Sequence, residues 1–205
     1  MFHDIEQNTD AWMALRLGKA TASNNSCFMA NYGKAFGEPA QRYALQLALE
    51  RITGTKAEFS FSNDHMERGH EQEPVARMLY EDQFFCDVEN GGFFDCGEYG
   101  DSPDGLVGDD GVIEIKSVIA MTHYATLRRG SYDPAYKWQI AGHLDCTQRN
   151  YVDFVSYCAD FPTDSQLIVY RISREKMKDE LEMLASRRVD FLKLVDDTIK
   201  LIKAI

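Results

Sequence analysis

Three residues near the middle of the chain, Asp104, Glu114 and Lys116, have the types and spacing needed for metal-assisted chemistry. They lie in the segments SPDGL, residues 102–106, and VIEIK, residues 112–116. Because side chains alternate faces along a β-strand, Glu114 and Lys116 are expected to share one face of the second segment. A turn between the two segments would fold them into an antiparallel hairpin and place Asp104 across from Glu114.

Residues of these types predict the hydrolysis of a phosphodiester. Two carboxylates that lie close together repel each other, and they stay ionised only if a cation lies between them. Oxygen ligands of this kind favour Mg²⁺ or Mn²⁺, which keep several waters and are completed by substrate phosphate. Such an ion lowers the pKa of a bound water and offsets the charge that builds up on phosphate. The Lys116 ammonium would orient or deprotonate the attacking water, or stabilise the pentavalent phosphate.

The same pattern has an ordinary structural explanation. An Asp before Gly is common in turns, and Ile-Glu-Ile-Lys is typical of a half-exposed strand. The spacing from Asp104 to Glu114 and Lys116 is simple enough to occur by chance. Taken alone, the pattern therefore leaves both interpretations open.

The elements that must position these residues are predicted from helix and strand signals. Ser23 is predicted to cap one helix, Pro39 to open another that Gly54 ends, and Ser173 to cap the last. Helices are predicted over residues 12–17, 24–30, 41–53, 66–83 and 134–147, and after residue 173. Strands are predicted within residues 93–117 and over residues 151–157 and 167–172. Helices before, between and after strands predict an α/β fold with a mixed central sheet flanked by helices.

Length and composition indicate one folded domain spanning residues 1–205. The chain has 205 residues, of which 44% are hydrophobic and 27% charged. No apolar run approaches the ~18–20 residues of a membrane span, and the N-terminus has no secretory pattern. Five scattered cysteines without a CxxC pair disfavour a zinc ribbon or an iron–sulfur centre. We therefore expect a cytoplasmic protein with free thiols and no membrane partner.

The negative charge of the chain is concentrated in one segment. The net charge is −11, and residues 58–110 hold fifteen acidic and two basic side chains, so the remainder is slightly positive. A negative chain is on its face a poor partner for nucleic-acid phosphates. The acidic segment is either a solvated face or a place where divalent cations bind.

Several segments in order resemble the lambda-type exonuclease family, the phage recombination or alkaline exonucleases of the PD-(D/E)xK superfamily. They are WMALRLGKATAS at 12–23, GHEQEPVAR at 69–77, SPDG at 102–105, IEIK at 113–116 and YKWQIAGHLDCT at 136–147. The resemblance covers most of the chain. It implies a restriction-endonuclease-like core and an enzyme, a metal-dependent deoxyribonuclease.

The resemblance also implies an active site. Its residues would be Glu73, Asp104, Glu114, Ile115, Lys116 and Gln139. The carboxylates and the Ile115 carbonyl would bind Mg²⁺ or Mn²⁺, with two ions per site. Lys116 would be the catalytic lysine, and Gln139 would help to place the water or the scissile phosphate. Without the resemblance, Glu73 would be assigned to an ion pair with Arg77, one helical turn further on.

Arg16, Ser23 and Ser102 match family residues that hold the terminal 5′-phosphate of DNA. A guanidinium, two hydroxyls and a helix N-terminus near Ser23 would form an anion pocket. The alternatives are a plain helix cap for Ser23 and a surface base for Arg16. The family's additional arginine is missing from the following loop, where Lys34 is the nearest base, so dependence on the 5′-phosphate is expected to differ. His143 is assigned a structural role, because such sites do not need imidazole.

The implied function is a Mg²⁺-dependent 5′→3′ exonuclease that digests one strand of linear double-stranded DNA from its 5′-phosphorylated end. It would release mononucleotides and leave a 3′ single-stranded overhang for homologous recombination by strand annealing. The implied partners are double-stranded DNA ends, a single-strand annealing recombinase protein and two further copies in a ring-shaped homotrimer, in the cytoplasm of a bacterial host. Two alternatives stay open. One is a structure-selective or nicking endonuclease of the same core, and the other is a catalytically inactive DNA-end-binding module.

Overall fold

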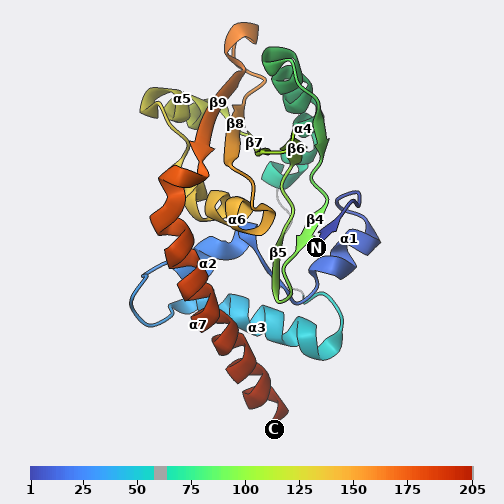
Figure 1. Cartoon of the computed structure of the whole chain (residues 1–205), viewed down its shortest axis with the longest axis vertical. Coiled ribbons are helices and arrows are strands. Elements are labelled where there is room, and N and C mark those ends of the chain that lie inside the picture. Colours follow the sequence, from blue (N-terminus) through green and yellow to red (C-terminus); the bar gives the residue numbers. More distant parts are fainter. Residues whose placement is uncertain (58–63, 205) are drawn as a thin grey trace.

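The computed structural model describes residues 1–57 and 64–204, with the backbone alone for residues 64–70 (Figure 1). The α-helices are α1 (Asp10–Arg16), α2 (Asn25–Met29), α3 (Glu38–Thr53), α4 (Asp64–Phe84), α5 (Ala120–Arg129), α6 (Lys137–Thr147) and α7 (Lys178–Lys203). Short 3₁₀ helices are η1 (Ala22–Asn24), η2 (Pro134–Tyr136), η3 (Thr163–Ser165) and η4 (Arg174–Met177). Within the described residues, no helix is long and apolar enough to cross a bilayer.

The strands form two sheets. The larger sheet has the order β3 (Val88–Asn90), β6 (Gly105–Val107), β7 (Gly111–Ser117), β8 (Tyr151–Tyr157) and β9 (Leu167–Ser173). The smaller sheet has the order β1 (Phe2–His3), β4 (Phe93–Asp95), β5 (Tyr99–Asp101) and β2 (Ala20–Thr21). In the larger sheet β7 and β8 are parallel and the other neighbours are antiparallel, so the predicted mixed sheet is confirmed.

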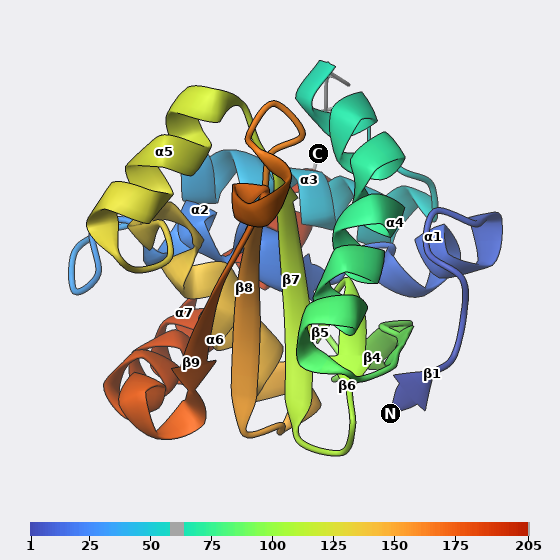
Figure 2. The same ribbon diagram turned by 90° about the horizontal axis from the view of Figure 1, so that it is seen from above.

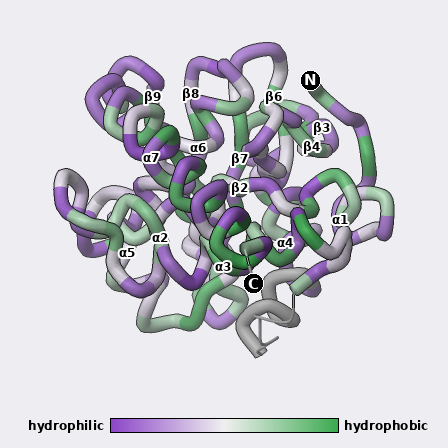
Figure 3. The backbone as a smooth tube through the Cα atoms, turned by 90° about the horizontal axis from the view of Figure 1, so that it is seen from below, coloured by the Kyte–Doolittle hydropathy of each residue, from purple (hydrophilic) through white to green (hydrophobic). Residues whose placement is uncertain are grey.

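Helices cover both faces of the larger sheet (Figure 2). On one face, α6 packs with α3 and α7 against alternate residues of β7 and β8 in a large apolar core. On the other face, Ala76 and Tyr80 of α4 pack against Ile113 and Ile115 of β7. Hydrophobic positions gather in the strands and the inner helices, whereas the turns around β8 and β9 are mostly hydrophilic (Figure 3).

Most predicted elements are present with nearly the predicted bounds. Pro39 lies in the first turn of α3, and Gly54 ends that helix with a left-handed φ of 69°. Asp133 accepts a hydrogen bond from the backbone N–H of Ala135 at 2.9 Å and opens the segment that leads into α6. The predicted helix over residues 66–83 falls within α4. The part of the acidic segment at residues 58–63 lies outside the described residues.

Three features differ from the predictions. Helix α5 was not predicted, because its buried positions His123 and Thr126 are polar while its apolar residues are exposed. Ser23 is not a helix N-cap, since it lies inside η1 and the cap position of α2 belongs to Asn24. In the smaller sheet, β4 and β5 lie within the predicted range of residues 93–117, whereas β1 and β2 were missed, because they have only two residues each.

Helix α6 approaches η1 so closely that Gly142 has no room for a side chain. A Cβ atom at Gly142 would lie 2.5 Å from the Cβ of Ala22 and 2.6 Å from Nδ2 of Asn25. The same Asn25 amide donates a hydrogen bond of 3.1 Å to the carbonyl of Trp138. The η1 segment is thereby held against α6, within one helical turn of Gln139.

A buried carboxylate ties β8 to β9 and α4. Asp153, which is 0% exposed, accepts hydrogen bonds from Nε of Arg171 at 2.8 Å and from its Nη2 at 2.7 Å. The hydroxyl of Tyr80 donates a further hydrogen bond of 2.6 Å. A carboxylate that is buried away from water needs such partners to offset its lost hydration.

Replacing Arg171 with Met is expected to lower the free energy of unfolding by about 2–3 kcal/mol. This is less than the roughly 3–5 kcal/mol for breaking a fully buried pair, because the Arg171 side chain is 52% exposed. Chemical denaturation measures the change. Arg42→Met is the control, since Arg42 is exposed and its nearest carboxylate is 3.9 Å away. A loss in R171M no larger than the roughly 0.5 kcal/mol expected of R42M would show that Asp153 does not need this partner.

Candidate active site

The hairpin formed by β6 and β7 places Asp104 across from Glu114, as predicted. Gly105 pairs with Ile113 in antiparallel register, so the next pair outward is Asp104 and Glu114. Ile113 packs on the side of α4, while the Glu114 side chain points to the opposite face and is only 1% exposed. A half-exposed strand does not bury its outward carboxylate. The strand is therefore buried, and not half-exposed as the ordinary structural explanation of this pattern assumed.

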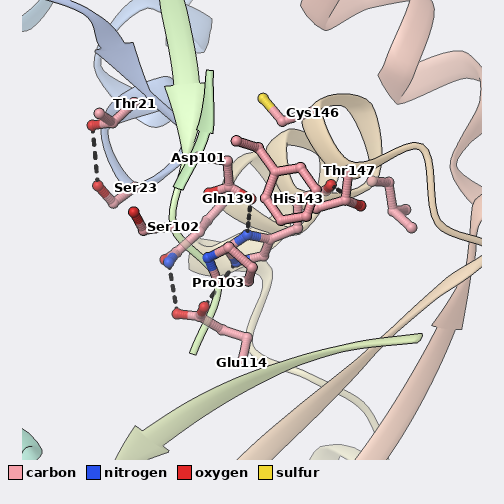
Figure 4. Close-up of polar contacts among 12 residues, drawn as sticks. Thr21, Ser23, Asp101, Ser102, Pro103, Glu114, Gln139, His143, Cys146 and Thr147 are labelled. Atoms are coloured by element: carbon pink, nitrogen blue, oxygen red, sulfur yellow. Dashed lines mark hydrogen bonds and ion pairs between the residues drawn. The ribbon is translucent and has the colours of Figure 1, made fainter. Parts of the chain in front are cut away.

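The Glu114 carboxylate is contacted by three polar side chains, of which Gln139 and His143 are shown in Figure 4. Its Oε1 atom forms an ion pair with Nζ of Lys116 and accepts a hydrogen bond of 2.6 Å from Nε2 of Gln139. Its Oε2 atom lies 2.8 Å from Nε2 of His143. Burial alone would raise the pKa of Glu114, but the positive charges of Lys116 and His143 lower it to about 2.

His143 joins two buried carboxylates. Its Nδ1 atom lies 2.7 Å from Oδ2 of Asp101, and its other ring nitrogen faces Glu114. Burial would lower the pKa of His143, but the two carboxylates raise it to about 10, so the ring is protonated. Sequence reasoning did not assign Asp101 or His143 to the site. The available signal was the spacing from Gln139 to His143, because residues four apart share one helix face.

Asp104 lies in a strongly negative environment. Burial raises the pKa of Asp104 well above its usual range, and the charges of Glu114 and Glu73 raise it further. Its Oδ2 atom accepts a hydrogen bond of 2.6 Å from the backbone N–H of Ile115. Glu73 also lies 3.9 Å from Nη2 of Arg77. Glu73 therefore forms the ion pair with Arg77 on the helix surface and also lies close enough to Asp104 to interact with its charge.

Lys116 remains protonated in this setting. Burial alone would lower the pKa of Lys116, but the carboxylates of Glu114 and Asp104 raise it above its usual value. The ammonium also lies 5.0 Å from the centre of the Tyr136 ring, a cation–π contact. The group is a positive charge that contacts Glu114 and lies close enough to Asp104 to interact with it.

The donor chemistry of the site fits a divalent cation. Asp104 and Glu114 face each other closely enough for their charges to interact, and the Ile115 carbonyl belongs to the same strand. Carboxylate and carbonyl oxygens are the ligands that Mg²⁺ and Mn²⁺ prefer. Within residues 1–57 and 64–204, however, no three His, Cys, Asp or Glu side chains form a preassembled metal cluster. Lys116 and Gln139 engage Glu114 instead.

The residues predicted for a 5′-phosphate lie around Trp12 and next to the site. The Trp12 indole N–H donates a hydrogen bond of 2.8 Å to Oγ of Ser102, and the Arg16 guanidinium lies 4.0 Å from the Trp12 ring centre. Ser23 Oγ lies 3.4 Å from Oγ1 of Thr21. Figure 4 shows Ser23 and Ser102 on the side of Gln139.

The Arg16 guanidinium has no polar partner among the residues that the structure describes. It forms neither a hydrogen bond nor an ion pair there, and it lies over the Trp12 ring. Burial lowers the pKa of Arg16, an effect that the charge of Asp101 partly offsets. A half-buried guanidinium without an acceptor is suited to bind an anion.

Comparisons with known proteins agree with this geometry. The model of the YqaJ-like viral recombinase domain matches residues 11–150. The chain belongs to the YqaJ-like viral recombinase family. No curated protein sequence matches the chain significantly.

Solved structures place this member of the YqaJ-like family among exonucleases. An alkaline exonuclease from Laribacter hongkongensis is 36% identical with a TM-score of 0.83, and the match covers 96% of this chain and 97% of that chain. A structure of LHK-Exo in complex with dAMP is 37% identical with the same TM-score of 0.83, covering 96% and 97%. A phage related exonuclease from Haemophilus somnus 129PT shares the fold at 13% identity, with a TM-score of 0.69 and coverage of 90% and 96%.

These matches confirm three predictions made from the sequence. The chain has the PD-(D/E)xK-type fold, it is related to the lambda-type exonucleases, and its enzyme class is a DNA exonuclease. The residues Asp104, Glu114, Lys116 and Gln139, drawn from β7, α6 and the loop before β6, meet within this fold.

Proposed function

We propose that this chain is a divalent-metal-dependent 5′→3′ exonuclease acting on the ends of double-stranded DNA. The observation that carries the proposal is the buried Glu114 carboxylate, which contacts Lys116 and Gln139 and faces Asp104 across the β6–β7 hairpin. The relationship to an alkaline exonuclease over nearly the full chain supports it. The proposal takes residues 1–205 as one exonuclease domain.

The hydrolytic step would depend on charges fixed before substrate binds. Glu73, Asp104, Glu114 and the Ile115 carbonyl would hold Mg²⁺ or Mn²⁺, with two ions per site. When bound, the metal supplies Lewis acidity and a water of lowered pKa. Lys116, which is held protonated, would stabilise negative charge on the scissile phosphate. Gln139 holds Glu114 and would orient the attacking water or the phosphate.

The polarity of digestion would follow from the anion pocket. Arg16 offers a guanidinium without an acceptor among the described residues, and Ser23 and Ser102 offer hydroxyls beside Gln139. A terminal 5′-phosphate bound there would place the next phosphodiester at the carboxylates. LHK-Exo was solved with dAMP, a deoxynucleoside monophosphate, which supports mononucleotides as the product.

Digestion of one strand would leave a 3′ single strand. The family description of a viral recombinase supports a role in recombination, with this strand passed to a single-strand annealing protein. Of the two alternatives, an endonuclease of the same core would cut DNA without ends. A binding module without activity is disfavoured, because the carboxylates and the lysine of the site are all present, Lys116 contacts Glu114, and Asp104 lies close enough to interact with their charges.

The central test uses linear duplex DNA with one labelled, 5′-phosphorylated end, together with a closed circle. With Mg²⁺, the wild-type chain is expected to release labelled mononucleotides from the linear DNA, to leave the circle intact, and to stop in EDTA. Lys116→Met is expected to lower the rate by at least about 10²–10³-fold, because a preorganised charge at the phosphate is lost.

The control for K116M is binding of the same DNA end in Ca²⁺, which should change little. Cutting of the circle would show that the chain is an endonuclease and not an exonuclease. Wild-type binding of ends without cutting in Mg²⁺ or Mn²⁺ would identify the inactive binding module. Full activity of K116M would show that Lys116 takes no part in the reaction.

Replacing Arg16 with Met is expected to slow digestion of a 5′-phosphorylated end about 10- to 100-fold, the equivalent of one charge-assisted hydrogen bond of about 1.5–3 kcal/mol. Digestion of a 5′-hydroxyl end should be nearly unchanged, so the ratio of the two rates is the measurement. Lys200→Met, at a site 75% exposed on α7, is the control. An equal loss on both ends would show that Arg16 does not read the phosphate.

Two exposed apolar faces support assembly into a ring-shaped homotrimer. One face follows α4 and ends at Phe85, which is 95% exposed, and the other lies on α5 around Met121, which is 72% exposed. The two helices lie on opposite flanks of the larger sheet (Figure 2). Two different faces that bind each other form a head-to-tail contact, and such contacts form a ring when the rotation from one copy to the next closes.

Light scattering is expected to give about 70 kDa for the assembly, three times the 23.4 kDa of one chain. Phe85→Ser and Met121→Ser should each shift the mass toward that of one chain. Leu201→Ser removes an equally exposed apolar side chain from α7 and is the control. A wild-type monomer, or dissociation of all three variants alike, would contradict this arrangement.

A further inference from the structure

The two oxygens of Glu114 have different environments. Oε1 is contacted by Lys116 and Gln139, on the side of the site that holds Asp104. Oε2 faces a ring nitrogen of His143 at 2.8 Å. The carboxylate is therefore fixed at both ends, and only one end is held by residues with a proposed part in the reaction.

The contact to Oε2 is the end of a longer buried chain. Asp101 Oδ2 lies 2.7 Å from Nδ1 of His143, and the exposures of Asp101, His143 and Glu114 are 2%, 0% and 1%. The contact of Nδ1 with Asp101 has hydrogen-bond geometry, whereas the contact of the other ring nitrogen with Glu114 is a close ion pair. The chain joins β5 of the smaller sheet, through α6, to β7 of the larger sheet.

Burying this carboxylate–imidazole pair lowers the free energy of unfolding unless its partners fully compensate, so its presence calls for a functional reason. Charged groups removed from water are rarely the most stable filling of a core, and apolar residues of similar volume are often as good. The adjacent positions Ile140 and Leu144 of α6 show that apolar side chains are accommodated there. The buried carboxylate–imidazole pair therefore suggests a role in the function of Glu114.

We propose that Asp101 and His143 are positioning residues, which hold the Glu114 carboxylate in the orientation required to bind the divalent cation. The proposal rests on the metal-dependent function proposed above. Groups that contact a metal ligand from outside set its orientation, and their loss typically costs about 10- to 100-fold in metal affinity.

The chain contains a matched control for this role. His123 is also 0% exposed, and its ring nitrogens lie 2.9 Å from Oγ of Ser156 and 2.9 Å from the carbonyl oxygen of Ser165. It therefore has the same burial and the same number of polar contacts as His143, but it touches no carboxylate of the site. A purely structural cost of losing a buried imidazole should be similar at the two positions.

The experiment is titration of the DNA-free chain with Mn²⁺, followed by calorimetry or by the electron paramagnetic resonance of free Mn²⁺. His143→Gln is expected to weaken Mn²⁺ binding about 10-fold, because one amide cannot bridge both carboxylates as the ring does. His143→Leu should weaken it further, toward 100-fold. His123→Gln should leave the dissociation constant within about twofold of wild type, although both Gln variants lower the melting temperature.

The outcomes separate this proposal from the function on which it rests. Wild-type chain that binds no Mn²⁺ would overturn metal dependence itself. Wild-type binding with unchanged affinity in folded H143Q would overturn only the positioning role, and so would an equal loss in H123Q. If H143L does not fold, H143Q against H123Q decides alone. A loss confined to the His143 variants supports the proposal.

Discussion

A carboxylate that is withdrawn from water must find compensating partners, and much of this structure is arranged around that requirement at Glu114. The side chain is 1% exposed, and its partners come from its own strand and from α6. Lys116 is supplied by the alternation of β7, two residues further on. Gln139 and His143 are supplied by one face of α6, four residues apart. An isolated buried carboxylate would cost several kcal/mol, so α6 and β7 must meet in this register.

The long connection between β7 and β8 makes that meeting possible. Parallel neighbours need a crossover, and here the crossover contains both α5 and α6. Gly142 then lets η1 approach α6 to a distance that no side chain would permit. Ser23 is carried by η1, so the packing that completes the Glu114 site also brings a hydroxyl of the proposed phosphate pocket beside it. The proposed metal site and the proposed phosphate pocket are therefore both supported by α6.

The parts of the site that were predictable are those governed by local rules. Asp104, Glu114 and Lys116 lie in one hairpin, where alternation and register fix their relation within the thirteen residues 104–116. Asp101 could not be assigned in this way, because its contact with His143 depends on how two sheets are placed around α6. Helix α5 was missed since its apolar residues face outward. Ser23 satisfied the sequence signal for a helix cap, but the chain forms a 3₁₀ turn there instead.

The charges of the site explain how an acidic segment can serve a DNA enzyme. Repulsion between Asp104 and Glu114 led us to expect a cation between them, and the protein supplies one in Lys116. His143 lies between Asp101 and Glu114 in the same way. These internal cations offset the charge of Glu114, whereas the pKa of Asp104 stays raised by burial and by the charges of Glu114 and Glu73. A divalent ion that binds there would compete with Lys116 for Glu114 and would free the ammonium for the phosphate. Metal binding and activation of the lysine would then be one event.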